Sequence, residues 1–278
     1  MEKRREIESV RMRLIEAGHC RLSSNWNYKR LSSPFSRIYL IEEGEAVLRH
    51  SGQTHHLKAG DLHLVPCHVT ADYQCPESHT QYFVGLTMTL ATGTDLFGIH
   101  RCEPTLPAEK VHYEIFKRLV DLIQPLTGKF GRLASVNLPM FVELEARGLA
   151  MQLAASFLKH ANEAVEVALE KDRRFAPILQ FVDENLQRDI ALETLAGLAG
   201  LTPTYFSDLF FKTQGVRPVE FINRRRIERA QLLLGSTDLT IQEIASAVGI
   251  NSPAYFSRLF NRISGVPARR YRKLLLDL

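Results

Sequence analysis

The sequence predicts an α+β protein of two parts: an N-terminal β-barrel with supporting helices, and a C-terminal all-α domain of seven helices. Three observations lead to this prediction. Short segments of alternating polarity lie between about residues 18 and 105, apolar residues take a helical period from about residue 106, and one helix is repeated near the C-terminus. With 278 residues, the chain is long enough for two domains that each bury a core.

The N-terminal segments alternate between apolar and polar residues, as strands with one buried face do. Turn residues at Glu43–Gly44, Ser51–Gly52 and Ala59–Gly60 separate several of them. Many short strands at close spacing are typical of a barrel or a sandwich. The expected strands are 36–40, 45–49, 55–58, 62–66 and 82–90.

Two longer helices are expected before the C-terminal part, at 107–122 and 138–160. The second carries apolar or small residues at alternating spacings of four and three, a seam that is typical of helix pairing between subunits. Packing on its own domain explains this stripe equally well, so both alternatives stay open. The seam consists of Leu144, Gly148, Met151, Ala155 and Leu158. The charged stretch 161–173 is expected to hold the boundary between domains 1–165 and 166–278.

Seven helices are expected after residue 174, and several of their ends carry capping residues. Thr202 and Ser252 precede a proline at the first helical position, where the missing N–H costs nothing. The segment Thr240–Glu243 has the sequence of a capping box. Gly215 and Gly265 stand where a helix stops, because glycine tolerates the left-handed conformation. The expected helices are 175–187, 192–199, 203–213, 218–234, 241–248, 253–263 and 267–276.

A repeat near the C-terminus is the most informative feature of the chain. Eight of the twenty residues in Thr202–Phe221 recur unchanged fifty positions later, in Ser252–Tyr271. Each copy follows a short amphipathic helix whose small residue, Ala196 or Ala245, lets two helices approach closely. A short helix, a tight turn and a longer helix make a helix-turn-helix unit, so two such units are expected.

The exposed face of each longer helix is expected to contact DNA. Arginine can bind guanine O6 and N7, and a carboxylate can accept from cytosine N4. Asp208 either reads a base in this way or forms a local salt bridge within its helix, and the salt bridge is the expected role. The expected base-reading residues are Thr204, Ser207, Asp208, Asn251, Ala254, Ser257 and Arg258. Lys212, Arg225 and Arg262 are expected at phosphates.

The charged residues are distributed unevenly, with a basic C-terminal domain following a near-neutral N-terminal part. The net charge of the chain is +4, and residues 173–278 carry 15 Lys and Arg against 10 Asp and Glu. Such a domain suits a polyanion.

The four cysteines form no C-x-x-C pair and indicate thiols in a reducing compartment. Without a secretory signal or an apolar run of about 20 residues, we expect a cytoplasmic protein with no membrane partner.

Short motifs at fixed spacings extend over about 100 residues of the C-terminal part. They are Leu195-Ala196, Tyr205-Phe206-Ser207, Leu209-Phe210, Gly215-Val216, Pro218, Ile244-Ala245, Val248-Gly249, Tyr255-Phe256-Ser257-Arg258, Phe260, Gly265 and Tyr271-Arg272. In these motifs, residues 175–273 resemble the DNA-binding domain of the AraC/XylS family of bacterial transcription regulators. The resemblance implies a regulator that binds double-stranded DNA, forms a homodimer and contacts RNA polymerase.

The chain departs from the family pattern at a few positions. Ala191 stands where the family usually has a capping Ser or Thr, whose loss costs ~1 kcal/mol. Phe210-Phe211 and Phe260-Asn261 stand where the family usually has Phe-Lys, so the phosphate role is expected to pass to Lys212 and Arg262. These changes are typical of drift within a working fold.

The N-terminal part resembles the cupin-like sensing barrel of many family members, above all in residues 57–66 (LKAGDLHLVP). This resemblance implies a small-molecule effector, with a sugar as one candidate. The indole of Trp26 could stack on a sugar ring or be ordinary core. Arg37 could bind an anionic ligand or pair with Glu42 or Glu43, and the internal pair is expected. The expected ligand-binding residues are Trp26, Arg37, His63 and His68.

Histidines 55, 56, 63 and 68 also raise the question of a metal. A cupin metal site needs His-x-His followed by a spaced Glu and another His, and that spacing is absent, so no metal and no cofactor are expected. No nucleophile motif or phosphate-binding loop occurs, so no catalytic residue is expected.

The main prediction is a ligand-responsive, sequence-specific transcription regulator. Three alternatives remain: a cupin-type metal-dependent enzyme domain fused to a DNA-binding domain, a ligand-independent DNA-binding protein, and an interaction module that has lost DNA binding.

Overall fold

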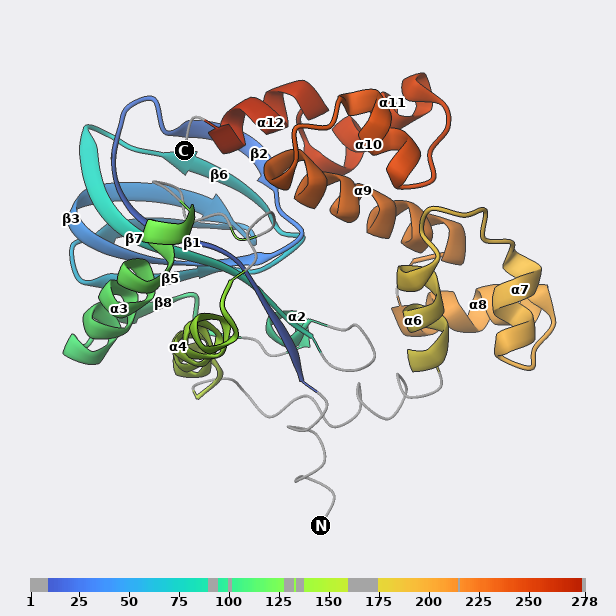
Figure 1. The fold of residues 1–278 in the computed structure, drawn as a ribbon, viewed down its shortest axis with the longest axis horizontal. Coiled ribbons are helices and arrows are strands. Elements are labelled where there is room, and N and C mark those ends of the chain that lie inside the picture. The colour runs from blue at the N-terminus through green and yellow to red at the C-terminus, as the bar shows by residue number, and fades with distance from the viewer. Residues whose placement is uncertain are drawn as a thin grey trace, which may run out of the picture.

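The computed structural model describes residues 10–89, 95–99, 102–127, 133, 138–159, 175–214 and 216–276. A β-sheet part with covering helices is followed by an entirely helical part (Figure 1). The expected α+β organisation is therefore confirmed. The expected boundary at 161–173 lies outside the described residues.

Eight strands form two antiparallel layers that share the long strand β3. They are β1 (Arg11–Ser23), β2 (Asn27–Ser32), β3 (Ser36–His50), β4 (Gln53–Lys58), β5 (Asp61–Val65), β6 (Thr70–Gln74), β7 (Ser78–Thr89) and β8 (Thr105–Pro107). The first half of β3 belongs to a layer ordered β1-β7-β3-β5-β8. Its second half pairs with β4 and β6, and β6 pairs with β2. Among the described strands these pairings do not show a closed barrel, so the barrel remains an expectation.

One expected turn is wrong. Glu43–Gly44 does not separate two strands, because β3 continues through it with a register shift between Ile41 and Glu43 against β7. Gly44 has φ +75°, and a Cβ there would collide with the carbonyl oxygen of Ser78. The glycine therefore lets two strands approach at a bend. The turns at Ser51–Gly52 and Ala59–Gly60 are confirmed, with positive φ at Ser51, Gly52 and Gly60.

Helices α3 (Lys110–Thr127) and α4 (Met140–Leu158) cover the outer face of the β1-β7-β3-β5-β8 layer, and a short α2 (Leu96–Ile99) follows β7. Figure 1 shows α3 and α4 beneath these strands. The first expected helix begins later than predicted because Pro107 ends β8, where it pairs with Asp61. The described helices include none that is long and apolar enough to cross a membrane.

The helical part has the seven helices that the sequence predicts, with ends shifted by a few residues. They are α6 (Ala176–Glu184), α7 (Leu192–Leu198), α8 (Pro203–Gln214), α9 (Pro218–Ser236), α10 (Ile241–Ala247), α11 (Pro253–Ser264) and α12 (Ala268–Leu276). The capping box of Thr240 and Glu243 is present, the Ser252 side chain accepts from the Tyr255 amide, and Gly265 is left-handed. Ala191 provides no side-chain cap. Gly215 lies outside the described residues.

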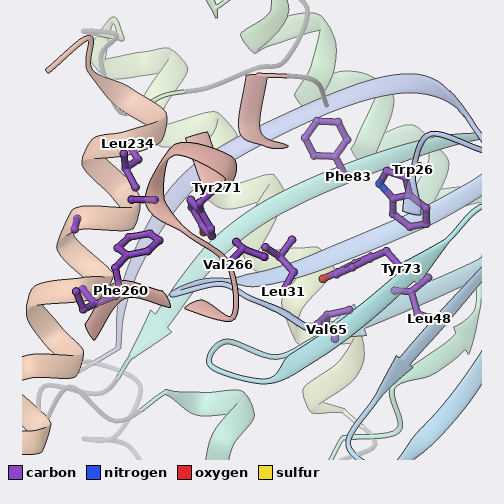
Figure 2. Packing of buried hydrophobic residues seen from close by; sticks show 14 of the residues in the cluster. Trp26, Leu31, Leu48, Val65, Tyr73, Phe83, Leu234, Phe260, Val266 and Tyr271 are labelled. Carbon is purple, nitrogen blue, oxygen red and sulfur yellow. The ribbon is translucent and has the colours of Figure 1, made fainter. Parts of the chain in front are cut away.

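The buried cores do not follow the division into sheet and helical parts. The first helix-turn-helix unit has its own core, built around Phe175, Phe206 and Phe210. The core of the second unit is continuous with the space between the two β-layers. Figure 2 shows Val266 and Tyr271 of this unit beside Leu31 of β2. The second unit is thus joined to the sheets by apolar packing.

Candidate DNA-binding and effector sites

The two predicted helix-turn-helix units are present. Helices α7 and α8 form the first, and α10 and α11 form the second, each with a left-handed glycine in the connecting turn: Gly200 with φ +67° and Gly249 with φ +77°. Ala196 and Ala245 are 1% and 2% exposed, as expected where two helices cross. The local sequence therefore builds two similar units.

The exposed faces of α8 and α11 differ. Asn251, Ala254, Ser257 and Arg258 of the second unit are all exposed. In the first unit Thr204 is exposed, but Arg217 Nη1 donates to Ser207 Oγ (3.0 Å) and lies 3.2 Å from Asp208 Oδ1. Asp208 thus forms the expected salt bridge, although its partner lies beyond the helix. The sequence reasoning missed Arg217, which follows α8 and lies against two expected base-reading residues.

The expected phosphate contacts differ in their availability. Lys212 and Arg262 are exposed in the last turns of α8 and α11. The prediction for Arg225 is wrong in this structure, because its guanidinium is held between two carboxylates. Arg225 Nε lies 2.7 Å from Asp183 Oδ1 and Nη1 lies 2.8 Å from Glu228 Oε2. It therefore ties α6 to α9 and is not free for DNA.

Helix α9 connects both units to each other and to the sheets. Its 19 residues span about 28 Å at ~1.5 Å per residue. Arg226 near its middle donates to the carbonyl oxygens of Leu186 (3.0 Å) and Arg188 (2.7 Å), which follow α6. Further along, Gln231 Nε2 donates to Ser32 O of β2 (3.0 Å). Helix α9 is therefore held against the end of α6 and anchored in the sheets.

A small cavity lies between the β-layers and contains two of the expected ligand residues. Its volume is about 30 Å³, room for about two water molecules. Aromatic side chains and a few polar groups line it, among them Trp26, Tyr39, Tyr73, Phe83, Glu16, Arg37 and Gln81. Trp26 is 3% exposed and meets Tyr73 edge to face at 5.2 Å between ring centroids. Trp26 and Arg37 are thus brought together as expected for a site.

Arg37 pairs with Glu16 of β1 and not with Glu42 or Glu43, so the expected partner is wrong. Its side chain points between the layers, where Nε donates to Glu16 Oε1 (3.0 Å) and Nη1 donates to Ser33 Oγ (2.6 Å). Burial alone would lower the pKa of Arg37, but the Glu16 carboxylate reverses this and raises it well above its usual value. Nη2 is buried and has no partner in the part of the chain that the structure describes.

The cavity is connected to the helical part by a short chain of polar side chains. The phenol of Tyr271 in α12 lies near the Ser33 side chain, which accepts a hydrogen bond from Arg37. Burial raises the pKa of Tyr271 to about 12, so the phenol stays neutral, and the nearby Arg37 charge acts in the opposite direction. Leu31, which lines the cavity, packs in the same core as Tyr271.

The two expected ligand histidines lie elsewhere. His68 Nδ1 is 3.4 Å from Glu228 Oε1 of α9, so His68 belongs to the contact between the sheets and the helical part. His63 is fully buried on β5, outside the cavity lining, and lies against His50 and His55. Sequence reasoning did not include His50, which only the hairpin of β3 and β4 brings near.

The apolar seam of α4 is largely open. Leu144 is 64% exposed and Met151 is 39% exposed, and next to them Phe141 is 70% exposed. A Cβ added at Gly148 would meet nothing within 4 Å. The opposite face of α4, with Ala146, Ala150 and Leu153, packs against the sheet layer. The stripe therefore does not pack on its own domain at Leu144 and Met151, and its pairing with a partner subunit stays a prediction.

A β-sheet domain with an interior cavity, joined to two helix-turn-helix units, defines a transcription regulator with a ligand-binding domain. Residues 15–140 match the family described as AraC-like ligand binding domain, and residues 195–274 match the family described as Helix-turn-helix domain. The chain belongs to the AraC family of DNA-binding transcriptional regulators.

Full-length relatives support this assignment. The chain is 27% identical over 243 residues to an uncharacterized HTH-type transcriptional regulator, YijO, of Escherichia coli, covering 86% of this chain and 81% of YijO. It is 26% identical over 242 residues to the lactose operon transcription activator of Staphylococcus xylosus, covering 85% and 83%. The fold resembles unsaturated fatty acid bound ToxT of Vibrio cholerae, with a TM-score of 0.56 at 14% identity and 98% of both chains covered.

Proposed function

We propose that the protein is an effector-controlled activator, in which a small molecule bound between the β-layers alters how the second helix-turn-helix unit is held. The observation that carries this proposal is the path from Arg37 through Ser33 to Tyr271. It links a cavity-lining group to the DNA-binding part through a single intervening side chain. The relative from Staphylococcus xylosus is named as a transcription activator, which supports activation.

The lining of the cavity constrains the chemistry of the effector. The buried, unpartnered Nη2 of Arg37 calls for an acceptor oxygen, such as a hydroxyl or a carboxylate. The rings of Trp26 and Tyr73 offer apolar surface to a flat face. A compact sugar or sugar acid has both features. Sugar acids would gain most, because the guanidinium is charged.

A cavity of about 30 Å³ is smaller than a sugar, so binding requires side chains to move. Leu31 lies between the cavity and Tyr271, and its displacement would disturb the packing of the second unit. Effector binding would then favour a second arrangement of the units, which is a shift of populations between two states. The arrangement described above would be the effector-free state.

A thermal-shift screen of the full chain tests the effector site. We expect a sugar or sugar acid to raise the melting temperature, because it binds only the folded protein. Trp26→Leu and Arg37→Lys should abolish the rise, while Arg21→Ala, on the exposed side of β1, should keep it. Stabilisation by the same compound in all variants would contradict this site.

The exposed faces of α8 and α11 support two unlike DNA contacts. We propose that Thr204, with Ser207 and Asp208 around Arg217, reads one half-site and that Arg258 with its neighbours reads another. Lys212 and Arg262 would contact phosphates. Helix α9 is about 28 Å long, which is comparable to one turn of DNA, about 34 Å. One chain would then recognise two DNA half-sites of different sequence, so its binding site would not be a palindrome.

The open face of α4 supports a homodimer. Phe141, Leu144 and Met151 form an apolar surface without partners among the described residues, and Gly148 permits close helix approach. Light scattering of the purified protein should give twice the chain mass, and Leu144→Asp should give one chain mass. Val219→Asp, an exposed apolar residue on α9, is the matched control and should stay dimeric. A monomeric wild type would refute this proposal.

A further inference from the structure

Three histidines from different strands meet in the interior of the sheet domain. His50 ends β3, His55 lies in β4, and His63 lies in β5. On each strand the residue two positions away, Leu48, Leu57 or Val65, packs in the core between the layers. Because side chains alternate along a strand, all three imidazoles face that interior. They lie apart from the lining of the effector cavity.

The three rings are close enough to share one ion. One nitrogen from each histidine lies within 4.8 Å of the other two, and His50 Nε2 lies 2.9 Å from His63 Nε2. A tetrahedral ion with bonds of about 2.0–2.1 Å to imidazole requires nitrogens about 3.3 Å apart. Binding of an ion would require the rings to rotate until all three nitrogens reach that spacing.

The inner nitrogens of His50 and His63 hydrogen-bond to each other, and a bound ion would replace that bond. His63 Nδ1 contacts Thr105 Oγ1 (2.8 Å) and His50 Nδ1 contacts Ser51 Oγ (3.2 Å), so the outer nitrogens orient the rings. His55 Nε2 is buried and has no partner in the described chain. Polar partners behind the ligand imidazoles are the usual arrangement of protein metal sites.

Burial lowers the pKa of all three imidazoles, for His50 to about 4. Neutral imidazole is the form that binds metals. Burial also argues against a cluster of charges, which would repel one another. The cluster consists of three histidines and includes no carboxylate. Hard cations such as Mg²⁺ or Ca²⁺, which prefer oxygen ligands, therefore do not match it.

We propose that His50, His55 and His63 bind one divalent first-row transition metal ion that prefers imidazole, such as Zn²⁺, with the fourth position open to water. The ion links the second half of β3 and β4 in one layer to β5 in the other. None of the three ligands lines the effector cavity, although His63 lies opposite the cavity-lining Tyr39 in the strand register. The site differs from the His-x-His arrangement of a cupin metal site, because its ligands come from three strands.

Metal titration of the full chain, freed of purification tags and stripped with a chelator, tests the site. We expect one equivalent of Zn²⁺ per chain, and a tetrahedral visible spectrum when Co²⁺ is used as the probe. His55→Ala, at the more accessible edge, should weaken binding by at least about 100-fold. His56→Ala is the matched control, because His56 is exposed on the same strand, and it should bind like wild type.

Thr105→Val is a second variant that leaves all three ligands in place. It should weaken Zn²⁺ binding by about 10-fold, because it removes only the partner of His63 Nδ1. Circular dichroism checks that each variant is folded. Equal Zn²⁺ affinity in wild type and His55→Ala, or a loss in His56→Ala as large as in His55→Ala, would overturn the proposal.

Discussion

At the scale of single residues, two arginines of α11 are expected to contact DNA in different ways. Arg258 lies on the exposed face beside Ser257, whereas Arg262 lies one turn later, in the last turn. Arg258→Ala should weaken binding to the operator by about 1–3 kcal/mol and leave binding to random DNA nearly unchanged. Arg262→Ala should weaken both equally, because it removes a phosphate contact. Fluorescence anisotropy with operator and random duplexes measures both losses.

The salt dependence of binding separates the same two roles. Loss of one phosphate contact reduces the slope of log K against log [salt] by about 1. We expect this reduction for Arg262→Ala but not for Arg258→Ala. If both variants lose equal affinity for operator and random DNA, the assignment of Arg258 to a base is wrong.

The buried pair of Arg37 and Glu16 should be costly to break. Their side chains are 5% and 9% exposed, so removing one leaves the other charge buried without compensation. Glu16→Ala should lower the free energy of unfolding by about 3–5 kcal/mol, measured by urea denaturation. The double variant Glu16→Leu with Arg37→Met should recover most of this loss.

An exposed ion pair is the control for that measurement. Glu143 and Arg147 on α4 pair at 2.6 Å, with side chains 45% and 42% exposed. Glu143→Ala should change the unfolding free energy little, because water screens such pairs. If Glu16→Ala lowered the unfolding free energy as little as Glu143→Ala does, the charge of Arg37 would have to reach solvent.

At the scale of elements, two left-handed glycines provide a matched comparison. Gly265, after α11, has φ +79°, and a Cβ there would collide with the carbonyl oxygen of Arg30 in β2. Gly200, between α7 and α8, has φ +67° with nothing within 4 Å. Both alanine variants lose about 1–2 kcal/mol from backbone strain. Gly265→Ala should lose more, because it also forces α11 away from β2.

Urea denaturation of both variants measures the difference. A larger loss at Gly265, together with faster proteolysis of the connection between sheets and helices, supports a close contact between α11 and β2. Equal losses at the two glycines would show that the contact gives way at little cost.

The elements of the helical part could be predicted because their signals are local. The capping box at Thr240, the cap at Ser252 and the stop at Gly265 lie within a few residues of the structure that they specify. The strands were predicted less completely: β1, β2, β6 and β8 were not among those expected. Strand pairing is non-local, and a bend such as that at Gly44 has the same local sequence as a turn.

The same limit applies to the candidate sites. Trp26 and Arg37 could be selected from their chemistry, since a lone tryptophan and an arginine on an apolar strand are conspicuous. The partner of Arg37, Glu16, lies on another strand and leaves no signal in the spacing. Arg225 shows the converse, because only the fold reveals that Asp183 of α6 lies beside it.

At the scale of the whole molecule, the path from Arg37 to Tyr271 should transmit the effector signal. Tyr271→Phe removes the hydroxyl near Ser33 while keeping the buried ring. We expect the variant to bind effector and DNA separately, but the change in DNA affinity caused by effector should fall toward zero. Titrating operator with and without effector measures this coupling.

Tyr113→Phe, on α3 and away from the helical part, is the control and should keep the coupling. By reciprocity, DNA should alter effector affinity in wild type and in Tyr113→Phe by the same factor. Full coupling in Tyr271→Phe would show that the signal passes through the apolar packing around Leu31 instead.

The separate core of the first helix-turn-helix unit has a consequence for how such regulators diversify. This unit lies at the far end of α9 from the sheets, while the second unit shares its core with them (Figure 1). If α8 reads one half-site as proposed, substitutions on it would change that half of the recognised sequence without disturbing the packing of the second unit on the sheets. Substitutions around α11 and α12 would have to preserve both DNA recognition and that packing. A lineage could then acquire new target genes through the first unit and keep the effector that it already answers to.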